Sequence, residues 1–396
     1  MSARDTDGLA VTSLNLSLPP SCIAFSPIHH DHLIIGTYFL EQSSDDNTQK
    51  EVQAEPQTRK GSLILFRLVN GTLNELQTIP TPSGILDAAF SPHDPSILCA
   101  ATSTGSLLFY RLAPSSTNSS LTLIPQHTLQ PFPTSILILD LEHHPTNPSV
   151  IGTTLSTGAT VLITTSAFSS APEVTEIHSH ALEAWTLAFS PCGNYIYSGA
   201  DDASLSLTQL SSPTPSSFDL EAAPGTTLTD RRTHGAGVTA ILPLRSSAEA
   251  HTLLTGSYDD HIRVLTMRPG RRAEVHAELD LGGGVWRLHL ILCSTHGSGR
   301  TWTLLASCMY AGARVVRVHC EDWESLNGWT IEVLQKFEAH KSMNYGSDVQ
   351  PVEGETKGKR TAVTSSFYDK LVCVWEVDAS CMHKSGPGVD RTVDHG

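Results

Sequence analysis

The stretch TGSYDDHIRVL, residues 255–265, decides the fold of this chain. Two small residues lead into an aspartate-containing tight turn, and an alternating apolar strand follows the turn. Upstream lie His234 and the apolar run VTAIL, which begins at residue 238. The order of histidine, strand, strand, turn and strand outlines one four-stranded propeller blade. The rest of the chain is therefore expected to contain further copies of this unit.

The same unit recurs along the chain. Small residues, a turn and an alternating strand follow one another in seven segments, among them LCAATSTGSLLFYRL (98–112), YSGADDASLSL (197–207) and VTSSFYDKLVCVWE (363–376). The word AFSP ends three apolar runs that we interpret as inner strands, at residues 24–27, 89–92 and 188–191. The sequence thus predicts an all-β fold, a seven-bladed WD-repeat β-propeller.

Closure of the ring follows from a spare strand at the start of the chain. Residues 9–17, LAVTSLNLS, alternate between apolar and polar, and we expect them to pair as the outer strand of the last blade, which removes an exposed edge. The propeller is predicted to be one domain over residues 1–376, followed by a disordered tail at 377–396. Loop insertions rich in Ser, Thr, Pro, Gly or charge are expected near residues 41–60, 113–134, 211–232 and 349–360.

Composition narrows the classes of partner and location. The chain has 396 residues and a net charge of −15, which argues against nucleic acid and suits a cationic partner, unless acidic loops simply keep the protein soluble. The amino terminus lacks the apolar core of a signal peptide, and no run is long enough for a membrane helix. Eight cysteines without a C-x-x-C motif suit reduced thiols, so we expect a cytoplasmic protein that needs no membrane and is a monomer.

Three histidines each stand four residues before a residue of an inner strand, and each is followed by a turn aspartate. In WD-repeat proteins such a pair hydrogen-bonds inside its blade, because an unpaired buried polar group is costly. We interpret this set as structural rather than as a metal site or a triad: His180, Asp202, His234, Asp259, His340 and Asp369.

Aromatic residues occupy a repeated position at the start of the inner strands. Trp185, Trp286 and Tyr345 are equivalent by spacing, and such positions face the mouth of the central channel. Tyr258, Tyr310 and Tyr368 lie at the turns of the same face. Together these rings are candidates for a cage that binds a quaternary ammonium by cation–π attraction, and packing at the blade edges is an equal alternative.

Polar residues accompany these rings, and each taken alone is more often a solvated loop residue: Glu183, Asp260, His261, Arg287, Ser342, Ser347 and Asp348. A carboxylate or histidine among them has the chemistry to activate water, and Arg287 has the chemistry to hold an oxyanion. The sequence contains no G-x-S-x-G elbow, P-loop or H-E-x-x-H motif, and Cys308 falls in a strand, where inert cysteines are common.

Several words of the sequence together resemble one family. They are EAW (183–185), SGADD (198–202), GSYDDH (256–261), GGGVWR (282–287), ASCM (306–309), HKSMNYGSD (340–348) and SSFYD (365–369). Over residues 180–376 the chain is similar to the WD-repeat diphthine methyl-ester hydrolases of diphthamide biosynthesis, also called diphthine methyltransferases. It departs from many relatives at Val349, and at Leu288 after the arginine, where relatives often carry tryptophan.

The resemblance implies an ester hydrolase that acts on translation elongation factor 2 carrying methylated diphthine and releases diphthine and methanol, with no cofactor and no metal. On this basis we hypothesise that water attacks the ester with Asp260 or Asp348 as base, His261 or His340 assisting and Arg287 stabilising charge. The alternative is a non-enzymatic WD-repeat scaffold for protein–protein interaction.

Overall fold

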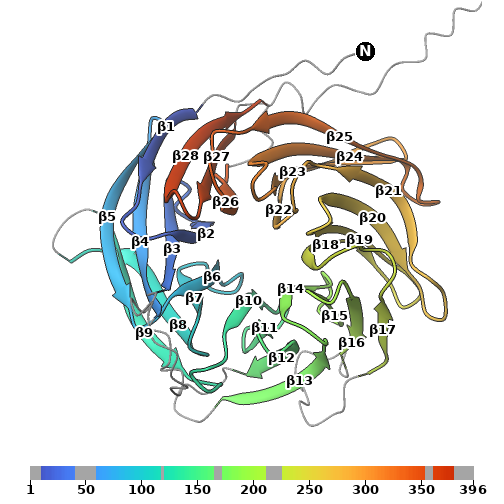
Figure 1. The fold of residues 1–396 in the computed structure, drawn as a ribbon, viewed down its shortest axis with the longest axis horizontal. Helices are drawn as coiled ribbons and strands as arrows, with labels where there is room; N and C mark the ends of the chain where they lie inside the picture. Colours follow the sequence, from blue (N-terminus) through green and yellow to red (C-terminus); the bar gives the residue numbers. More distant parts are fainter. Residues whose placement is uncertain are drawn as a thin grey trace, which may run out of the picture.

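The computed structural model describes residues 10–40, 59–116, 120–164, 172–210, 225–352 and 360–378. These residues form 28 strands and no helix, grouped into seven four-stranded antiparallel sheets. Figure 1 shows the sheets as blades around a common centre, with the first strand of each blade innermost. The predicted seven-bladed β-propeller is confirmed. No helix in the described ranges is long and apolar enough to span a membrane.

Each blade is a meander whose strands run outward in chain order. Blade 1 comprises β2 (Pro20–Phe25), β3 (His32–Leu40), β4 (Arg59–Val69) and β5 (Thr72–Thr81). Blade 2 comprises β6 (Ile85–Phe90), β7 (Ile97–Thr102), β8 (Leu107–Pro114) and β9 (Leu121–Leu129). Blade 3 comprises β10 (Ile138–His143), β11 (Val150–Leu155), β12 (Ala159–Thr164) and β13 (Glu173–Ser179). Blade 4 comprises β14 (Ala184–Phe189), β15 (Tyr195–Ala200), β16 (Leu205–Gln209) and β17 (Thr227–Asp230). Blade 5 comprises β18 (Val238–Ser246), β19 (His251–Ser257), β20 (His261–Met267) and β21 (Glu274–Asp280). Blade 6 comprises β22 (Arg287–His296), β23 (Gly299–Ser307), β24 (Ala313–Asp322) and β25 (Asn327–Phe337).

Blade 7 joins the two ends of the described chain. It contains β26 (Asn344–Val349), β27 (Arg360–Ser366), β28 (Leu371–Val377) and, as its outer strand, β1 (Ala10–Asn15). β1 pairs antiparallel with β28 from Ala10 opposite Trp375 to Asn15 opposite Leu371. The predicted closure by the amino-terminal strand is therefore confirmed, and β28 has no open edge.

Burial follows the position of a strand within its blade. All seven residues of β19, a second strand, are buried, whereas β21 at the outer edge of the same blade has none buried. The second and third strands are packed on both faces by neighbouring blades, so their sequences are continuously apolar or small. Outer strands face solvent on one side, and this gives them the alternating pattern seen in the sequence.

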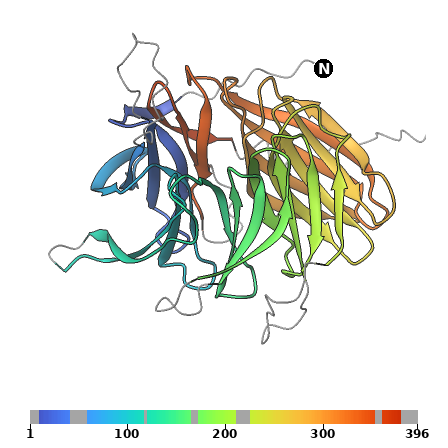
Figure 2. The ribbon, with the colours of Figure 1, turned by 60° about the horizontal axis from the view of Figure 1, so that its bottom comes forward.

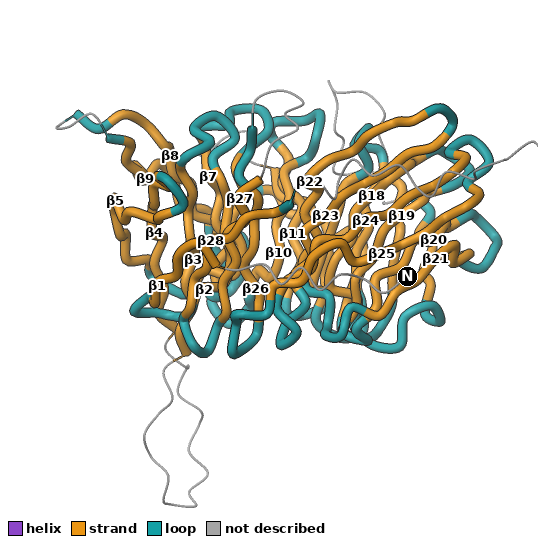
Figure 3. The backbone as a smooth tube through the Cα atoms, turned by 90° about the horizontal axis from the view of Figure 1, so that it is seen from above, coloured by secondary structure: helices purple, strands orange, loops and turns teal. Residues whose placement is uncertain are grey.

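The loops gather at the two faces of a thick disc, as Figures 2 and 3 show. The loop that enters each inner strand and the turn between the second and third strands lie on the same face, because the strands alternate in direction. We call this the upper face. It carries all the aromatic positions that the sequence analysis selected.

The expected loop insertions fall largely on positions outside the described residues, namely 41–58, 117–119, 211–224 and 353–359, and so does the tail from 379. Within the described parts, strands β8 and β9 take up residues 113–114 and 121–129 of the segment 113–134. Strand β17 likewise falls inside the segment 211–232, and β28 continues to Val377.

The structural histidines are buried inside their blades, but hydroxyl groups separate them from their aspartates. The two ring nitrogens of His180 lie 2.7 Å from Ser204 Oγ and 2.8 Å from Ser198 Oγ, and Ser204 donates to Asp202. His340 lies 2.9 Å from Ser366 Oγ and 2.7 Å from Thr364 Oγ1.

The expectation of a direct histidine–aspartate bond is therefore corrected. The aspartate instead accepts a backbone N–H from the loop after its histidine: Asp202 from Ala181 at 2.9 Å, Asp259 from Gly235 at 2.7 Å and Asp369 from Lys341 at 3.1 Å. Both ring nitrogens of His180 and His340 thus have neutral partners, whereas His234 has Thr255 at Nε2 and no partner among the described residues at Nδ1. The charged aspartate fixes the loop in all three blades.

Candidate active site

A local irregularity at the start of the inner strands places one residue per blade at the channel mouth. The pairing register shifts there in six of the seven blades, for example between Ala184 and Thr186 and between Val238 and Ala240. In blade 6, Trp286 directly precedes β22. The equivalent residues around the ring are Ser21, Leu86, Leu139, Trp185, Thr239, Trp286 and Tyr345.

Four aromatic rings from blades 4 to 7 meet at this mouth. The ring centroid of Trp286 lies 5.5 Å from that of Trp185, 6.0 Å from Tyr258 and 4.9 Å from Tyr345. All four side chains are partly exposed. We call these four residues the aromatic cluster. The predicted meeting of Trp185, Trp286 and Tyr345 on one face is confirmed, whereas their role in binding stays a prediction.

The other two predicted tyrosines lie farther out. Tyr310 is 60% exposed and its hydroxyl donates to Asp260 at 3.4 Å. Tyr368 is 69% exposed and contacts Phe367, whose ring in turn lies 5.7 Å from Tyr345. Neither tyrosine has a ring contact with the aromatic cluster, and Phe367, which the sequence analysis did not select, does.

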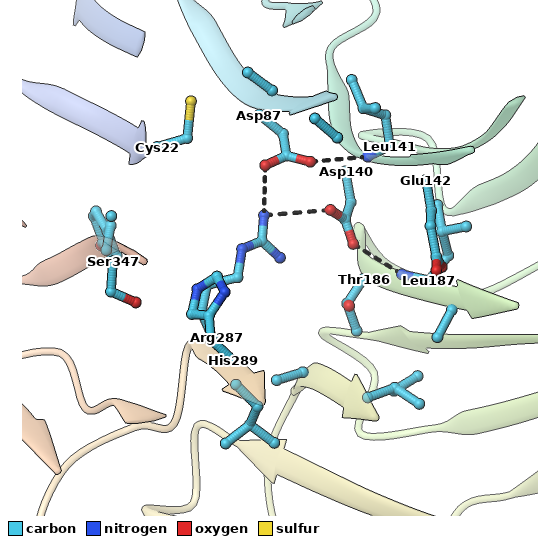
Figure 4. A pocket seen from close by; sticks show the side chains of 18 of the residues that line it. Cys22, Asp87, Asp140, Leu141, Glu142, Thr186, Leu187, Arg287, His289 and Ser347 are labelled. Carbon is cyan, nitrogen blue, oxygen red and sulfur yellow. Dashed lines mark hydrogen bonds and ion pairs between the residues drawn. The ribbon is translucent and has the colours of Figure 1, made fainter. Parts of the chain in front are cut away.

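A cavity of about 330 Å³ lies in the channel and is lined by the inner strands of all seven blades. Tyr345 lines it, so the aromatic cluster adjoins the cavity. Polar and charged side chains of the inner strands surround the cavity, and where one strand contributes two of them they are two residues apart. They include Asp87, Asp140, Glu142, Arg287, His289 and Ser347 (Figure 4).

Arg287 projects between two carboxylates from the other side of the ring. The Nη2 atom of Arg287 lies 3.5 Å from Asp87 Oδ1 and 3.3 Å from Asp140 Oδ1. The guanidinium carbon also lies 5.6 Å from the ring centroid of Trp286. Arg287, Asp87 and Asp140 keep only 18%, 14% and 10% of their side-chain surface exposed, so this charge triad is shielded from bulk water.

Each carboxylate also ties its blade to the next one. Asp140 accepts the N–H of Leu187 at 3.0 Å, and Asp87 accepts that of Leu141 at 3.2 Å. Two residues farther along the same strand as Asp140, Glu142 accepts the N–H of Phe189. Asp348 accepts the N–H of Phe25 at 2.7 Å across the junction of the last and first blades. The carboxylates are therefore held in place by backbone groups, and one oxygen of each is committed to that contact.

Burial shifts the proton affinities of these groups. Desolvation raises the pKa of Glu142 to about 8, against the opposing hydrogen bond from Phe189. Desolvation also raises the pKa of Asp348 to about 6 and that of Asp87 above its ordinary range, where Arg287 works in the opposite direction. Burial opposes the charge on Arg287, but Asp140 and Asp87 outweigh it and raise the arginine pKa. At neutral pH the cavity thus holds a fixed cation and a carboxyl group, Glu142, that retains its proton.

His289 lies two residues after Arg287 on strand β22 and was missed by the sequence analysis. Its Nδ1 is 3.9 Å from Asp348 Oδ1, and its Nε2 is buried without a hydrogen-bond partner. Burial, and then the charge of Arg287, lower the pKa of His289 to about 4. The imidazole is therefore neutral at physiological pH, and its buried Nε2 has no hydrogen-bond partner among the described residues.

Four of the five predicted catalytic residues are not among those that line the cavity, namely Asp260, His261, His340 and Asp348. Asp260 occupies the turn after Asp259 with a φ of 68°, and His261 Nδ1 lies 2.6 Å from the carbonyl oxygen of Asp259. His340 is buried inside blade 7 with both ring nitrogens next to hydroxyls. The structure does bring Arg287 to the cavity, and Asp348 beside His289.

Cysteine nucleophiles are disfavoured by burial. Desolvation raises the pKa of Cys22, which lines the cavity, to about 12, and it raises that of Cys308 to about 12 as well. Both remain thiols at neutral pH, and the thiol is a poor nucleophile.

The missed residues Asp140, Glu142 and His289 left a signal in the sequence, which Arg287 shares. Asp140 and Glu142 in LDLEH, and Arg287 and His289 in WRLHL, are polar at alternate positions of otherwise apolar inner strands. Alternation puts such residues on one face of a strand, and on an inner strand that face is the channel. Only the closed ring shows that these strands face one another.

Comparison with known proteins supports the same fold and adds relatives. A family model for the "WD domain, G-beta repeat" matches residues 172–207, which span β13 to β16. A chain in the crystal structure of a mitotic checkpoint complex has a TM-score of 0.59 over 95% of both chains, at 14% identity, which concerns the fold alone.

Curated proteins match over most of the chain. The diphthine methyltransferase of Schizosaccharomyces pombe is 28% identical over 360 residues, covering 90% of this chain and 94% of that protein. The Saccharomyces cerevisiae protein of the same name is 27% identical over 95% of this chain and all of its own length, and the human one is 28% identical over 86% of this chain and 74% of its length. The chain is therefore similar over most of its length to proteins named diphthine methyltransferase, at 27–28% identity.

Proposed function

We propose that this protein hydrolyses the methyl ester of methylated diphthine on translation elongation factor 2, giving diphthine and methanol. One observation carries the proposal: an aromatic cluster adjoins a shielded cavity that holds Arg287 between carboxylates. The names of the relatives point to diphthine as the substrate. We further propose that the protein acts as a monomer in the cytoplasm.

The aromatic cluster suits the trimethylammonium group of diphthine. A quaternary ammonium cannot donate hydrogen bonds, so ring faces and diffuse negative charge are the groups that recognise it. The rings of Trp185, Tyr258 and Tyr345 all lie next to that of Trp286, with centroid distances of 5.5, 6.0 and 4.9 Å. Contact with such rings is worth about 0.5–2 kcal/mol each, depending on how far the cation is desolvated.

Arg287 suits the ester end of the same substrate. When water adds to an ester carbonyl, negative charge develops on the carbonyl oxygen, and a fixed guanidinium in a shielded site stabilises that charge strongly. Asp87 and Asp140 hold the guanidinium in place before substrate arrives. The carboxylate product would then repel these acidic neighbours, which favours its release.

The decisive experiment incubates the purified protein with elongation factor 2 that carries the methyl ester, in water labelled with heavy oxygen. Hydrolysis at the carbonyl carbon predicts loss of one CH₂ unit from the factor, one labelled oxygen in the new carboxylate and one methanol per site. Transfer of the methyl group to another acceptor would give no methanol, and a scaffold would leave the ester intact; either result overturns the proposal.

Two variants sharpen this test. Arg287→Met should abolish ester loss, because the developing oxyanion loses its stabilising cation. Arg271→Ala removes the same charge from an exposed hairpin in blade 5, away from the channel cavity, and should leave the rate unchanged. Equal activity in the two variants would show that the cavity around Arg287 is not the reaction site.

A further inference from the structure

The imidazole of His289 has an unusual position for a residue without a structural task. It comes from inner strand β22 and lines the channel cavity, and its Nε2 is buried with no hydrogen-bond partner. Leaving such an atom unsatisfied costs about 1–3 kcal/mol in a folded protein. Ten other buried side-chain atoms of the described residues also lack a partner, so what singles out His289 is that it is the histidine lining the cavity.

Asp348 is placed to orient this imidazole. Its carboxylate accepts the N–H of Phe25 at 2.7 Å and that of Val349 at 2.7 Å, so the group cannot rotate freely. Its Oδ1, which accepts the Val349 N–H, lies 3.9 Å from His289 Nδ1, so a movement of the imidazole by about 1 Å would complete a hydrogen bond. A proton held on Nδ1 by Asp348 leaves Nε2 as the acceptor, the tautomer that a general base requires.

We propose that His289, positioned by Asp348, is the general base that activates water for ester cleavage, with Arg287 facing the oxyanion. This inference rests on the proposed function. His289 is thereby a catalytic residue, Asp348 a positioning residue, and the substrate class is a methyl ester carried next to a quaternary ammonium.

The step balances with water as the only co-reactant. A water oxygen attacks the ester carbonyl carbon while its proton passes to His289 Nε2, and the carbonyl electrons move to the oxygen that Arg287 stabilises. The tetrahedral intermediate then collapses, and the bond between carbonyl carbon and methoxy oxygen breaks. His289 returns its proton to the leaving oxygen, which departs as methanol, and the new carboxylic acid releases a proton to solvent.

Other groups in the cavity fit the role of base less well. Asp87 and Asp140 are engaged with Arg287 and with backbone donors. Glu142 accepts the N–H of Phe189, and its raised pKa keeps it protonated near neutrality. Among the cavity-lining residues that the structure describes, only His289 has a neutral basic nitrogen, its Nε2, that lacks a hydrogen-bond partner.

The charges around His289 set its pH dependence. Arg287 on the same strand and Asp348 on β26 are its nearest charged neighbours, β18 contributes only Ala240, Ile241, Leu242 and Pro243 to the cavity, and Asp87, Asp140 and Glu142 stand across it. Asp348 loses its proton near pH 6. The rate should therefore rise as pH passes through about 6, because only the ionised carboxylate stabilises the imidazolium that forms during attack.

The test measures single-turnover release of methanol from ester-bearing elongation factor 2 by three variants. His289→Ala should slow release by about 10²–10⁴-fold, with partial rescue by added imidazole. Asp348→Asn should slow it less and remove the rise near pH 6, which a purely structural role would not do. His296→Ala, at the exposed far end of the same strand, is the matched control and should react like the wild type.

Two outcomes overturn the inference while leaving the proposed function standing: full activity of His289→Ala, or an unchanged pH profile in Asp348→Asn. Absence of methanol release from the wild type would instead refute the proposed function itself. If His289→Ala fails to fold, His289→Gln keeps the volume and a polar end, and its rate decides in the same way. Binding of tetramethylammonium, read by tryptophan fluorescence, should persist in every folded variant.

Discussion

Arg287 and Asp140 come from blades 6 and 3 and approach each other across the channel, with a guanidinium nitrogen 3.3 Å from a carboxylate oxygen. The two inner strands share no hydrogen bonds, so this contact exists only because the ring of blades is closed. Arg287 is therefore expected to contribute both to the proposed reaction and to the stability of the propeller.

Replacing Arg287 by methionine should lower stability as well as activity. Asp87 and Asp140 would remain in the channel without their cation, and breaking a buried pair in this way costs about 3–5 kcal/mol. Protonation relieves the repulsion, so the loss in the free energy of unfolding should be smaller at pH 5 than at pH 8. Urea unfolding at both pH values measures this, and the added change Asp87→Asn should restore part of the loss. A loss that is independent of pH would contradict the charge argument.

Replacing Trp286 by alanine should weaken binding of a quaternary ammonium. Trp286 contacts the other three rings of the aromatic cluster, so its removal opens the cluster. We expect the dissociation constant for tetramethylammonium to rise by roughly 2- to 30-fold, which corresponds to about 0.5–2 kcal/mol. Calorimetric titration gives the value, and Trp286→Phe, which keeps a ring, should lose less. Equal losses in both variants would exclude a cation–π contribution.

Replacing Glu142 by glutamine should stabilise the protein at alkaline pH. Its pKa is raised to about 8 in the folded state, against about 4.3 in an unfolded chain. The stability that this group contributes is fully present below the unfolded pKa and is lost as pH rises through the folded one. Glutamine cannot ionise, so the Tm of the variant should exceed that of the wild type by a few degrees at pH 9. Thermal unfolding at pH 5, where both side chains are uncharged in the folded state, should show a smaller difference.

Replacing His340 by alanine should affect stability and spare the chemistry. Its two ring nitrogens face Ser366 and Thr364, and Trp375 Nε1 donates to the same threonine at 3.2 Å. Loss of this network should cost about 1–3 kcal/mol of unfolding free energy. The rate of ester loss per folded molecule should stay at the wild-type value. A fully folded but inactive variant would restore His340 to the catalytic set.

Removing residues 1–17 should destabilise the ring. Strand β1 covers the edge of β28, and its Leu14 packs beside the core of blades 1 and 7. The deletion exposes that edge and leaves blade 7 with three strands, so we expect Tm to fall by more than about 5 °C and aggregation to increase. Deleting residues 1–9 alone keeps β1 whole and serves as the control. An equal Tm for both deletions would contradict the role of closure.

The sequence by itself determined the repeat, and through it the fold. Each blade carries its own signals within about fifty residues, namely an apolar inner strand, small residues, a turn and an alternating strand, as in residues 234–265. In three blades the turn also carries an aspartate, at Asp202, Asp259 and Asp369. The same spacing identified Trp185, Trp286 and Tyr345 as equivalent positions, and the structure confirmed that they meet. These inferences succeeded because the interactions concerned are local in sequence or repeat from blade to blade.

Only the tertiary structure decided which polar residues share the channel. Asp260 and His261 stand close to Tyr258 in the sequence, yet they lie in a turn and do not line the cavity. Asp87, Asp140, Glu142 and His289 instead converge on it from three separate inner strands, β6, β10 and β22. Their convergence depends on the number of blades and on how each strand is rotated about its own axis. Those quantities are set by packing between blades along the whole ring, and no local stretch of sequence contains them.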